Sequence, residues 1–279
     1  MDDLALAPAP VTLALKKPHI FDPMVDLVLE YKGRKVNVQG LFDTGASDTM
    51  VPPQIAEKLG FDLNKLEAAT RFHGVKGRHT TFPIIFDRMT FKEIPGCSVG
   101  PVFARTSRVS PMDYLLIGRP LMQAAGMKIA FDRAKHAFRI TCTRPDVSVR
   151  RMTSGARLVD ERESIVREAV LRHGNIELQG PVILDTGATG TLLPLWLAKQ
   201  LGMQPKPLFV RGHGAVQSFT ILAGRLDEIE IVGTSCRGGP YPAMITPHAN
   251  YVLVGVDFFL DAGLTIDFSG KDTRIYCGK

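Results

Sequence analysis

The hydrophobic residues of this chain occur in short runs that are separated by polar, glycine-containing turns. The runs are rich in Val, Ile, Phe and Thr, and hairpin-like turns occur at Lys32-Gly33-Arg34 and His173-Gly174-Asn175. Short amphipathic helical patterns end at a glycine in Leu59-Gly60 and Leu201-Gly202. The pattern therefore predicts a mainly β protein with a few short helices.

One apolar run in each half leads into nearly the same five residues. Leu41 and Phe42 precede Asp43-Thr44-Gly45-Ala46-Ser47, and a similar run precedes Asp185-Thr186-Gly187-Ala188-Thr189, 142 positions later. A second landmark, Tyr114–Gly118, matches Tyr251–Gly255 at an offset of 137. The shrinking offset indicates shorter loops in the second half, because loops tolerate deletions. The chain is therefore an internal duplication.

The repeat defines the expected domains. A unit of about 115 residues is too long for a solenoid repeat and has the size of a small domain. We expect one lobe over residues 20–143, a polar linker over 144–162 that includes Arg150 and Arg151, and a second lobe over 163–279.

Composition and charge exclude several classes of protein. With 279 residues, 45% of them hydrophobic and 22% charged, the chain is long enough for two globular domains. The formal net charge of +6 permits nucleic-acid binding, but the basic residues form no dense patch, so we expect no nucleic-acid partner. The longest apolar runs fall far short of the ~20 residues that cross a bilayer, so we expect no membrane span.

The N-terminal residues leave the cellular location open. Asp2 and Asp3 stand where a secretory signal carries positive charge, and Pro8 and Pro10 break the apolar stretch that follows. A native N-terminus predicts a cytoplasmic protein, and removal of a signal peptide would predict a periplasmic or secreted one. Residues 1–20 fit a pro-segment, a strand of a sheet shared by the lobes, or a tail.

The cysteines also leave two alternatives. Cys97 matches Cys236, and Cys142 matches Cys277, with separations of 45 and 41 residues within the halves. One disulfide per lobe would fit an oxidising compartment. The alternative is two pairs of buried free thiols inherited by duplication, which the missing export signal slightly favours.

The two aspartates carry the candidate chemistry. Each stands where an apolar strand passes into a loop, so Asp43 and Asp185 can meet at a face shared by the two halves and share one proton. Such a pair can hydrolyse a peptide bond without a cofactor, since one carboxylate activates water while the other acid polarises the carbonyl. Gly45 and Gly187 permit a tight turn and bring backbone N–H groups near the carboxylates.

These motifs resemble the aspartic protease superfamily of pepsins and retropepsins, over nearly the whole chain. The resemblance implies two pseudo-twofold-related retropepsin-like lobes with the active site between them, an Asp43/Asp185 dyad and an extended peptide or protein substrate. It implies a monomer that acts as a fused pseudo-dimer. The alternatives are a catalytically silent peptide-binding or assembly module on the same fold, and a dimer in which each unit pairs with another chain.

The resemblance also implies supporting roles. The Thr44 and Thr186 hydroxyls would bond to the opposite backbone, and Ser47 and Thr189 would donate to the outer carboxylate oxygens. The hairpins with His73-Gly74 and His213-Gly214 would form flaps over the substrate, although neither has the tyrosine of the pepsin flap. We expect no metal, because the histidines and cysteines lack ligand spacing. The Gly-Arg-Asp trio of retroviral proteases is divided between Gly118-Arg119 and Val256-Asp257.

Overall fold

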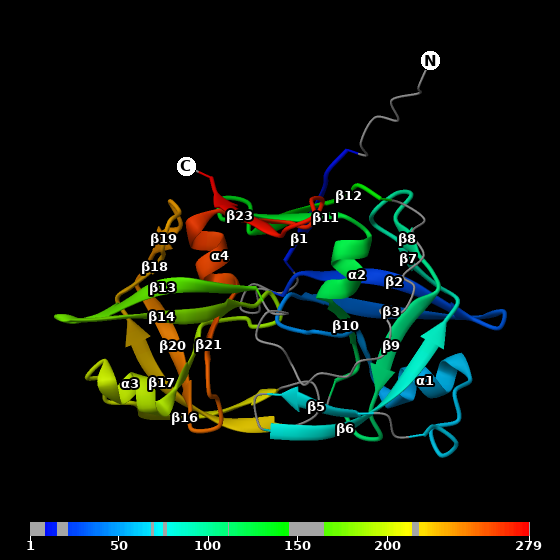
Figure 1. Cartoon of the computed structure of the whole chain (residues 1–279), viewed down its shortest axis with the longest axis horizontal. Coiled ribbons are helices and arrows are strands. Elements are labelled where there is room, and N and C mark those ends of the chain that lie inside the picture. The colour runs from blue at the N-terminus through cyan, green and yellow to red at the C-terminus, as the bar shows by residue number, and fades with distance from the viewer. Residues whose placement is uncertain are drawn as a thin grey trace.

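The protein is mainly β, in two lobes. The computed structural model describes residues 9–15, 22–67, 70–74, 77–110, 112–144, 165–213 and 218–278. In these residues the strands form two nine-stranded sheets and one five-stranded sheet (Figure 1). Each nine-stranded sheet belongs to one half of the chain, which we call lobe 1 and lobe 2.

The two lobe sheets have equivalent strand orders, β5-β6-β9-β4-β10-β3-β2-β7-β8 and β16-β17-β20-β15-β21-β14-β13-β18-β19. In each, the central strand (β10 or β21) pairs in parallel with β3 or β14 and antiparallel with β4 or β15. The strands of lobe 1 are β2 (Met24–Tyr31), β3 (Arg34–Asp43), β4 (Met50–Val51), β5 (Thr70–Gly74), β6 (Gly77–Phe86), β7 (Arg88–Phe91), β8 (Ser98–Val99), β9 (Val102–Thr106) and β10 (Leu115–Gly118). Those of lobe 2 are β13 (Val166–His173), β14 (Ile176–Leu184), β15 (Leu192–Pro194), β16 (Lys206–His213), β17 (Ser218–Leu226), β18 (Glu228–Ile231), β19 (Arg237–Gly238), β20 (Tyr241–Thr246) and β21 (Val252–Val254).

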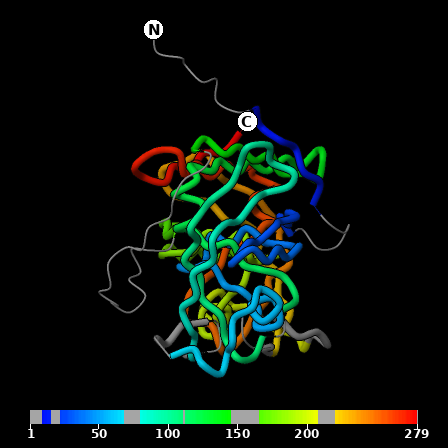
Figure 2. Tube along the Cα trace, turned by 90° about the vertical axis from the view of Figure 1, so that its right-hand side faces the viewer, coloured from blue at the N-terminus to red at the C-terminus, as the bar shows by residue number. Residues whose placement is uncertain are grey.

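A third sheet joins the lobes, at the top of Figure 1. Its strands, in spatial order, are β1 (Val11–Ala14), β12 (Ala137–Cys142), β11 (Met127–Asp132), β22 (Leu264–Asp267) and β23 (Arg274–Cys277). Strand β11 of the first half pairs with β22 of the second, with Ile129 opposite Ile266. Strand β1 forms one edge of this sheet (Figure 2), so residues 11–14 are a strand of the shared sheet, one of the three alternatives for the N-terminal segment. Residues 1–8 and 16–20 lie outside the described residues.

The helices of the described part are short and occupy equivalent places. They are α1 (Pro53–Leu59), α2 (Arg119–Ala124), α3 (Leu195–Gln200) and α4 (Val256–Ala262). Helix α1 ends at Gly60, whose φ of 101° is a left-handed conformation that glycine adopts without strain. None of these helices has the length and apolar character that a membrane span needs.

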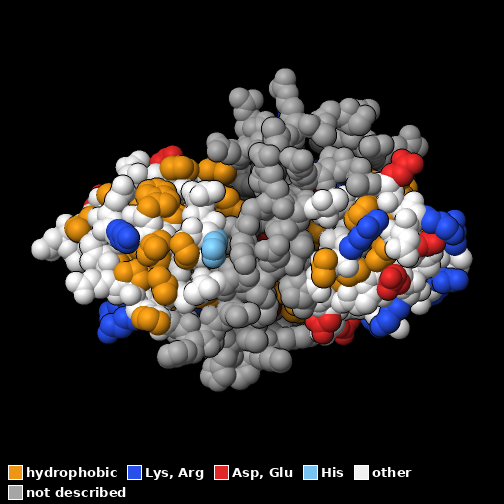
Figure 3. All heavy atoms as spheres, turned by 90° about the horizontal axis from the view of Figure 1, so that it is seen from below, with side chains coloured by type: hydrophobic (Ala, Val, Ile, Leu, Met, Phe, Trp, Pro, Cys, Tyr) orange, Lys and Arg blue, Asp and Glu red, His pale blue; other side chains and the backbone are white. Residues whose placement is uncertain are grey.

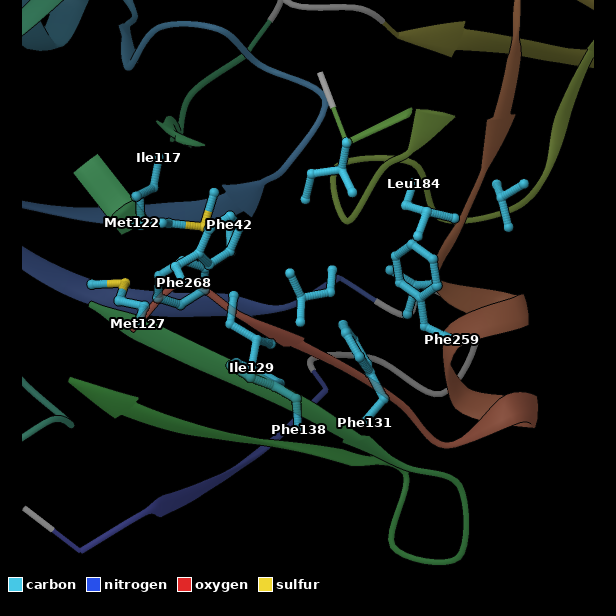
Figure 4. Close-up of a cluster of buried hydrophobic side chains, with 14 of the residues drawn as sticks. Phe42, Ile117, Met122, Met127, Ile129, Phe131, Phe138, Leu184, Phe259 and Phe268 are labelled. Carbon is cyan, nitrogen blue, oxygen red and sulfur yellow. The ribbon is translucent and has the colours of Figure 1, made fainter. Parts of the chain in front are cut away.

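The hydrophobic core lies between the shared sheet and the two lobe sheets (Figure 4). Phe42 and Leu184 are fully buried, and the Phe42 ring packs edge-on against Phe138 with centroids 6.2 Å apart. Successive side chains of a strand point to opposite faces. Because Phe42 and Leu184 point into the core, the residues that follow them, Asp43 and Asp185, point away from it.

The structure contains two disulfides, which decides between the two alternatives for the cysteines. Cys97 bonds to Cys142, and Cys236 bonds to Cys277. Cys97 and Cys236 lie just before the edge strands β8 and β19, whereas the other two cysteines end β12 and β23 of the shared sheet. Each disulfide therefore ties the outer edge of a lobe sheet to the shared sheet.

We expect the double substitution Cys97→Ala/Cys142→Ala to lower the free energy of unfolding by about 2–4 kcal/mol, because the bond constrains the unfolded chain. Urea denaturation without reductant measures the change. Thiol titration of the denatured, unreduced wild type provides the control and should detect no free thiol. Four reactive thiols would show that the disulfides do not form.

Candidate active site

The central strands of each lobe deliver one aspartate to the junction between the lobes. Asp43 is the last residue of β3, and Asp185 directly follows β14. The neighbouring parallel strands fix the two aspartates. Gly118 of β10 lies opposite Asp43, and the N–H of Asp185 donates to the carbonyl of Val254 in β21 at 3.0 Å. The two strand ends are thus fixed in equivalent ways.

Four buried hydrogen bonds join the two loops. Thr186 Oγ1 accepts from the N–H of Thr44 at 3.0 Å, and Thr44 Oγ1 accepts from the N–H of Thr186 at 3.0 Å. The Thr44 hydroxyl donates to the carbonyl of Leu184 at 2.7 Å, and the Thr186 hydroxyl donates to that of Phe42 at 2.5 Å. Both threonines are buried, so water does not compete for these bonds. The bonds fix how closely the two aspartates approach.

Backbone N–H groups of the two loops donate hydrogen bonds to the carboxylates. Oδ1 of Asp185 accepts from the N–H of Gly187 at 2.8 Å and from that of Gly45, in the other lobe, at 3.3 Å. The N–H of Ala46 donates to Oδ1 of Asp43 at 2.9 Å. A Cβ atom on Gly45 would lie 2.7 Å from Cγ of Asp185, and one on Gly187 would lie 2.5 Å from Cγ of Asp43. Glycine is therefore required at both positions for the carboxylates to fit.

The electrostatics of the pair favour a retained proton. Burial raises the pKa of Asp43 well above its usual range, and the charge of Asp185 raises it further, while backbone N–H groups oppose the rise. Burial also raises the pKa of Asp185. The hydrogen bond with Asp43 and those from three backbone N–H groups lower this pKa and so oppose part of the rise. Because two adjacent like charges resist double ionisation, the pair keeps one proton where exposed aspartates are ionised.

Two tyrosines near the pair were identified in the sequence only as landmarks of the repeat. Burial, followed by the charges of Asp22, Asp43 and Asp113, raises the pKa of Tyr114 to about 12. Burial and the charges of the two aspartates of the pair also raise the pKa of the equivalent Tyr251. Both hydroxyls therefore stay protonated beside the carboxylates. Their repetition was the sequence signal that could have identified them.

Thr189 makes a different contact from the one that the resemblance implies. Its hydroxyl donates to Oδ1 of Asp22 at 2.9 Å, and a hydroxyl has only one proton to donate. Asp22 precedes β2 of lobe 1, so this bond also crosses between the lobes. No sequence motif marks Asp22, because only the folded chain brings it to the second loop. Ser47 is half-buried on the equivalent loop of lobe 1, and its contact with the pair stays a prediction.

The loops after the two aspartates are held by different acidic residues. In lobe 1, Asp48 pairs with Arg105 of β9 at 2.7 Å, whereas Arg119 is a buried residue of α2. In lobe 2, Asp257 at the start of α4 accepts from the N–H and the hydroxyl of Thr191 at 3.2 and 3.3 Å. Burial raises the pKa of Asp257 to about 6, against the opposing effect of these hydrogen bonds.

The hairpins predicted as flaps are strand pairs in both lobes. Strand β5 pairs with β6, and β16 pairs with β17; β5, β6 and β16 lie at the bottom of Figure 1. His73 and Gly74 end β5, and His213 ends β16, while Gly214 lies outside the described residues. The role of these four residues in substrate binding stays a prediction.

The surface on the hairpin side differs between the lobes. Figure 3 shows hydrophobic side chains gathered over lobe 2, at the left, and more charged side chains over lobe 1, at the right. Trp196 of α3 is half exposed, where α1 has Gln54 in the equivalent position. In the described part of the chain, no three His, Cys, Asp or Glu residues are placed to hold a metal ion.

We expect Thr186→Val to lower the free energy of unfolding by about 2–4 kcal/mol, because it leaves the N–H of Thr44 and the carbonyl of Phe42 buried without their partner. Thr186→Ser keeps the hydroxyl and serves as the matched control. Urea denaturation of both variants measures the difference. Equal stabilities of the Val and Ser variants would contradict the importance of these bonds.

The raised pKa values predict a pH-dependent stability. A carboxyl group with a higher pKa in the folded state stabilises the fold at low pH, and this contribution is lost as the pH rises through the folded-state pKa. We therefore expect Asp43→Asn to raise Tm at neutral pH and to have little effect below the usual aspartate pKa. Scanning calorimetry across pH tests this, with the exposed Asp272→Asn as control. A Tm difference independent of pH would disprove the expectation.

Two known proteins are similar to parts of this chain. A solved retropepsin-like aspartic protease from Rickettsia conorii is 18% identical, with a TM-score of 0.37 over 47% of this chain and 90% of that one. An uncharacterized protein of Rickettsia prowazekii (strain Madrid E) is 38% identical over 65 residues, 22% of this chain and 28% of that protein, so the chain spans about a quarter of this relative's length.

The profile of a family described as aspartyl protease matches residues 28–121 and 146–258. The two matches confirm the internal duplication, and the structure confirms the predicted mainly β fold with two related lobes. The chain therefore belongs to the aspartyl protease family.

Proposed function

We propose that the chain is an aspartic endopeptidase that hydrolyses peptide bonds of extended polypeptides with a water molecule activated by Asp43 and Asp185. The observation that supports this most directly is the reciprocal contact between the lobes, in which the glycine of each loop lies against the carboxyl group of the other. Burial and raised pKa values give the pair the single proton that this chemistry uses.

In the proposed reaction, the ionised carboxylate takes a proton from water as the water oxygen attacks the carbonyl carbon. The protonated carboxyl group donates its proton to the carbonyl oxygen. As the tetrahedral intermediate collapses and the C–N bond breaks, the carboxyl group that took the water proton donates it to the leaving nitrogen, and one hydroxyl of the intermediate returns a proton to the other carboxylate. The pair then again holds one proton, so no cofactor and no covalent intermediate is needed.

The other site residues would position this pair and the substrate. Thr44, Gly45, Thr186 and Gly187 hold the two carboxyl groups in contact, and Ser47 and Thr189 support the loops. The hairpins with His73-Gly74 and His213-Gly214 would cover an extended peptide and hydrogen-bond to its backbone.

A single chain would hold one complete site. In this proposal, lobes 20–143 and 163–279, joined by residues 144–162, act as a monomeric pseudo-dimer. Sedimentation at working concentration should therefore give the mass of one chain.

We expect Asp43→Asn and Asp185→Asn each to lower kcat/KM for peptide cleavage by about 10²–10⁴-fold, since each removes one half of the acid-base pair. A mixed peptide library, incubated from acidic to neutral pH and read by mass spectrometry, measures cleavage. The exposed Asp272→Asn is the matched control and should cut as the wild type does.

Two outcomes would count against the proposal. Cleavage that survives either aspartate substitution would show that the pair is not the catalyst. If the wild type binds peptides but cuts none, the chain is instead the catalytically silent peptide-binding module.

A further inference from the structure

The sheet face that bears Asp43 can be followed outward through the strand register. Side chains alternate along a strand, and paired residues of neighbouring strands share a face. Leu41, two residues before Asp43, therefore points to the same side. Leu41 pairs with Leu116 of the neighbouring strand β10. Leu116 in turn pairs with Met50 of β4, and Met50 pairs with Arg105 of β9. In lobe 1 a row of three hydrophobic residues thus runs from the aspartate to an arginine.

The equivalent row in lobe 2 is hydrophobic to its end. Ile183, two residues before Asp185, pairs with Leu253, which pairs with Leu192, which pairs with Met244. These side chains belong to one hydrophobic cluster that is separate from the main core. Met244 is the register equivalent of Arg105, so the two rows differ in polarity at this outer position.

Arg105 is one member of a set of three polar residues. Its Nε donates to Oδ2 of Asp48 at 2.7 Å, and its Nη1 donates to Oγ1 of Thr81 at 3.5 Å. Thr81 is fully buried, and the side chains of Arg105 and Asp48 are only 17% and 22% exposed. Thr81 shares the face because Pro83, two residues later, pairs with Arg105.

All three positions are apolar in lobe 2. The register and the 142-residue offset place Gly190 at the position of Asp48, Ile221 at that of Thr81 and Met244 at that of Arg105. A Cβ on Gly190 would lie 3.5 Å from Cε of Met244, so these residues are also neighbours in space.

The fold itself does not require the polar set. Moving an ion pair out of water has a desolvation cost that is often larger than the attraction between the two charges. Lobe 2 has the same strand order with Gly190, Ile221 and Met244 at these positions and holds its loop through Asp257 and Thr191, so the architecture does not require an ion pair at these three positions. The polar set lies on the same sheet face as the aspartate, and it occurs in lobe 1 but not in lobe 2. This difference points to a role in binding.

We propose that Asp48, Thr81 and Arg105 make the enzyme select an uncharged polar substrate side chain on the lobe 1 side of the scissile bond, and an aliphatic one on the lobe 2 side. This inference rests on the proposed endopeptidase function. The Asp48–Arg105 pair is neutral as a whole, so within this set a charged substrate group finds no excess of the opposite charge. An amide or hydroxyl group can hydrogen-bond to the partly exposed pair, whereas an aliphatic side chain displaces water from it and offers no hydrogen bond in return.

The proposal is tested by giving each lobe the residues that the other lobe has at these three positions. Cleavage of a peptide library by the full-length wild type should prefer Asn, Gln, Ser or Thr on one side of the scissile bond and Leu, Ile or Val at the matching position on the other. Asp48→Gly/Thr81→Ile/Arg105→Met should favour aliphatic residues on both sides, with at least a tenfold change in the ratio of kcat/KM values for polar and aliphatic peptides. Gly190→Asp/Ile221→Thr/Met244→Arg should favour polar residues on both sides.

The kcat/KM ratio within one variant does not depend on the fraction of folded enzyme, so a purely structural role would leave it unchanged. Should a triple variant fail to fold, Asp48→Asn/Arg105→Gln removes both charges and keeps hydrogen-bonding groups, so it should retain the polar preference. A symmetric wild-type profile, an unchanged ratio in the folded triple variant, or loss of polar preference in the Asn/Gln variant would overturn the inference and leave the proposed function intact. A wild type that cuts no peptide would instead disprove the proposed function.

Discussion

The structure depends on holding two mutually repelling carboxyl groups together in a buried position. Burial raises the pKa of both Asp43 and Asp185, so the pair is a cost to the fold unless they share a proton. The four hydrogen bonds of Thr44 and Thr186 stabilise the close approach of the two carboxyl groups, because each threonine bonds to the backbone of the other lobe. Because each bond crosses between the lobes, neither lobe can form the site alone.

The rest of the fold keeps the lobes at the spacing that these bonds need. Strand β11 pairs with β22 in the sheet that joins the lobes, and each disulfide ties that sheet to the edge of one lobe sheet. The buried Phe42 and Leu184 anchor the strand ends from the core side. Because Asp43 and Asp185 directly follow these buried residues, their side chains point to the opposite face of the strands, toward the junction between the lobes.

The duplication made the fold and the aspartates predictable, because a repeated strand-to-loop motif constrains both local structure and pairing. The contact of Thr189 with Asp22 was not predictable, since it joins residues 167 positions apart through the arrangement of the lobes. Cysteine spacing likewise left disulfides and free thiols open, because separation along a chain does not give distance in space. The difference between Arg105 and Met244 is visible in the sequence, but only strand register shows that both lie on the aspartate's face.

Joining both lobes in one chain removes a constraint that a symmetric dimer obeys. In a homodimer every substitution appears on both sides of the twofold axis, so a charged position near the axis is duplicated. Here the loop of lobe 1 is held by Asp48 and Arg105, whereas that of lobe 2 is held by Asp257 and Thr191. The buried bonds at the junction are equivalent in the two lobes, whereas the polar contacts farther out differ. Under the proposed function, a peptide that differs in chemistry on the two sides of its scissile bond is the kind of ligand that such an asymmetric site would bind in one orientation.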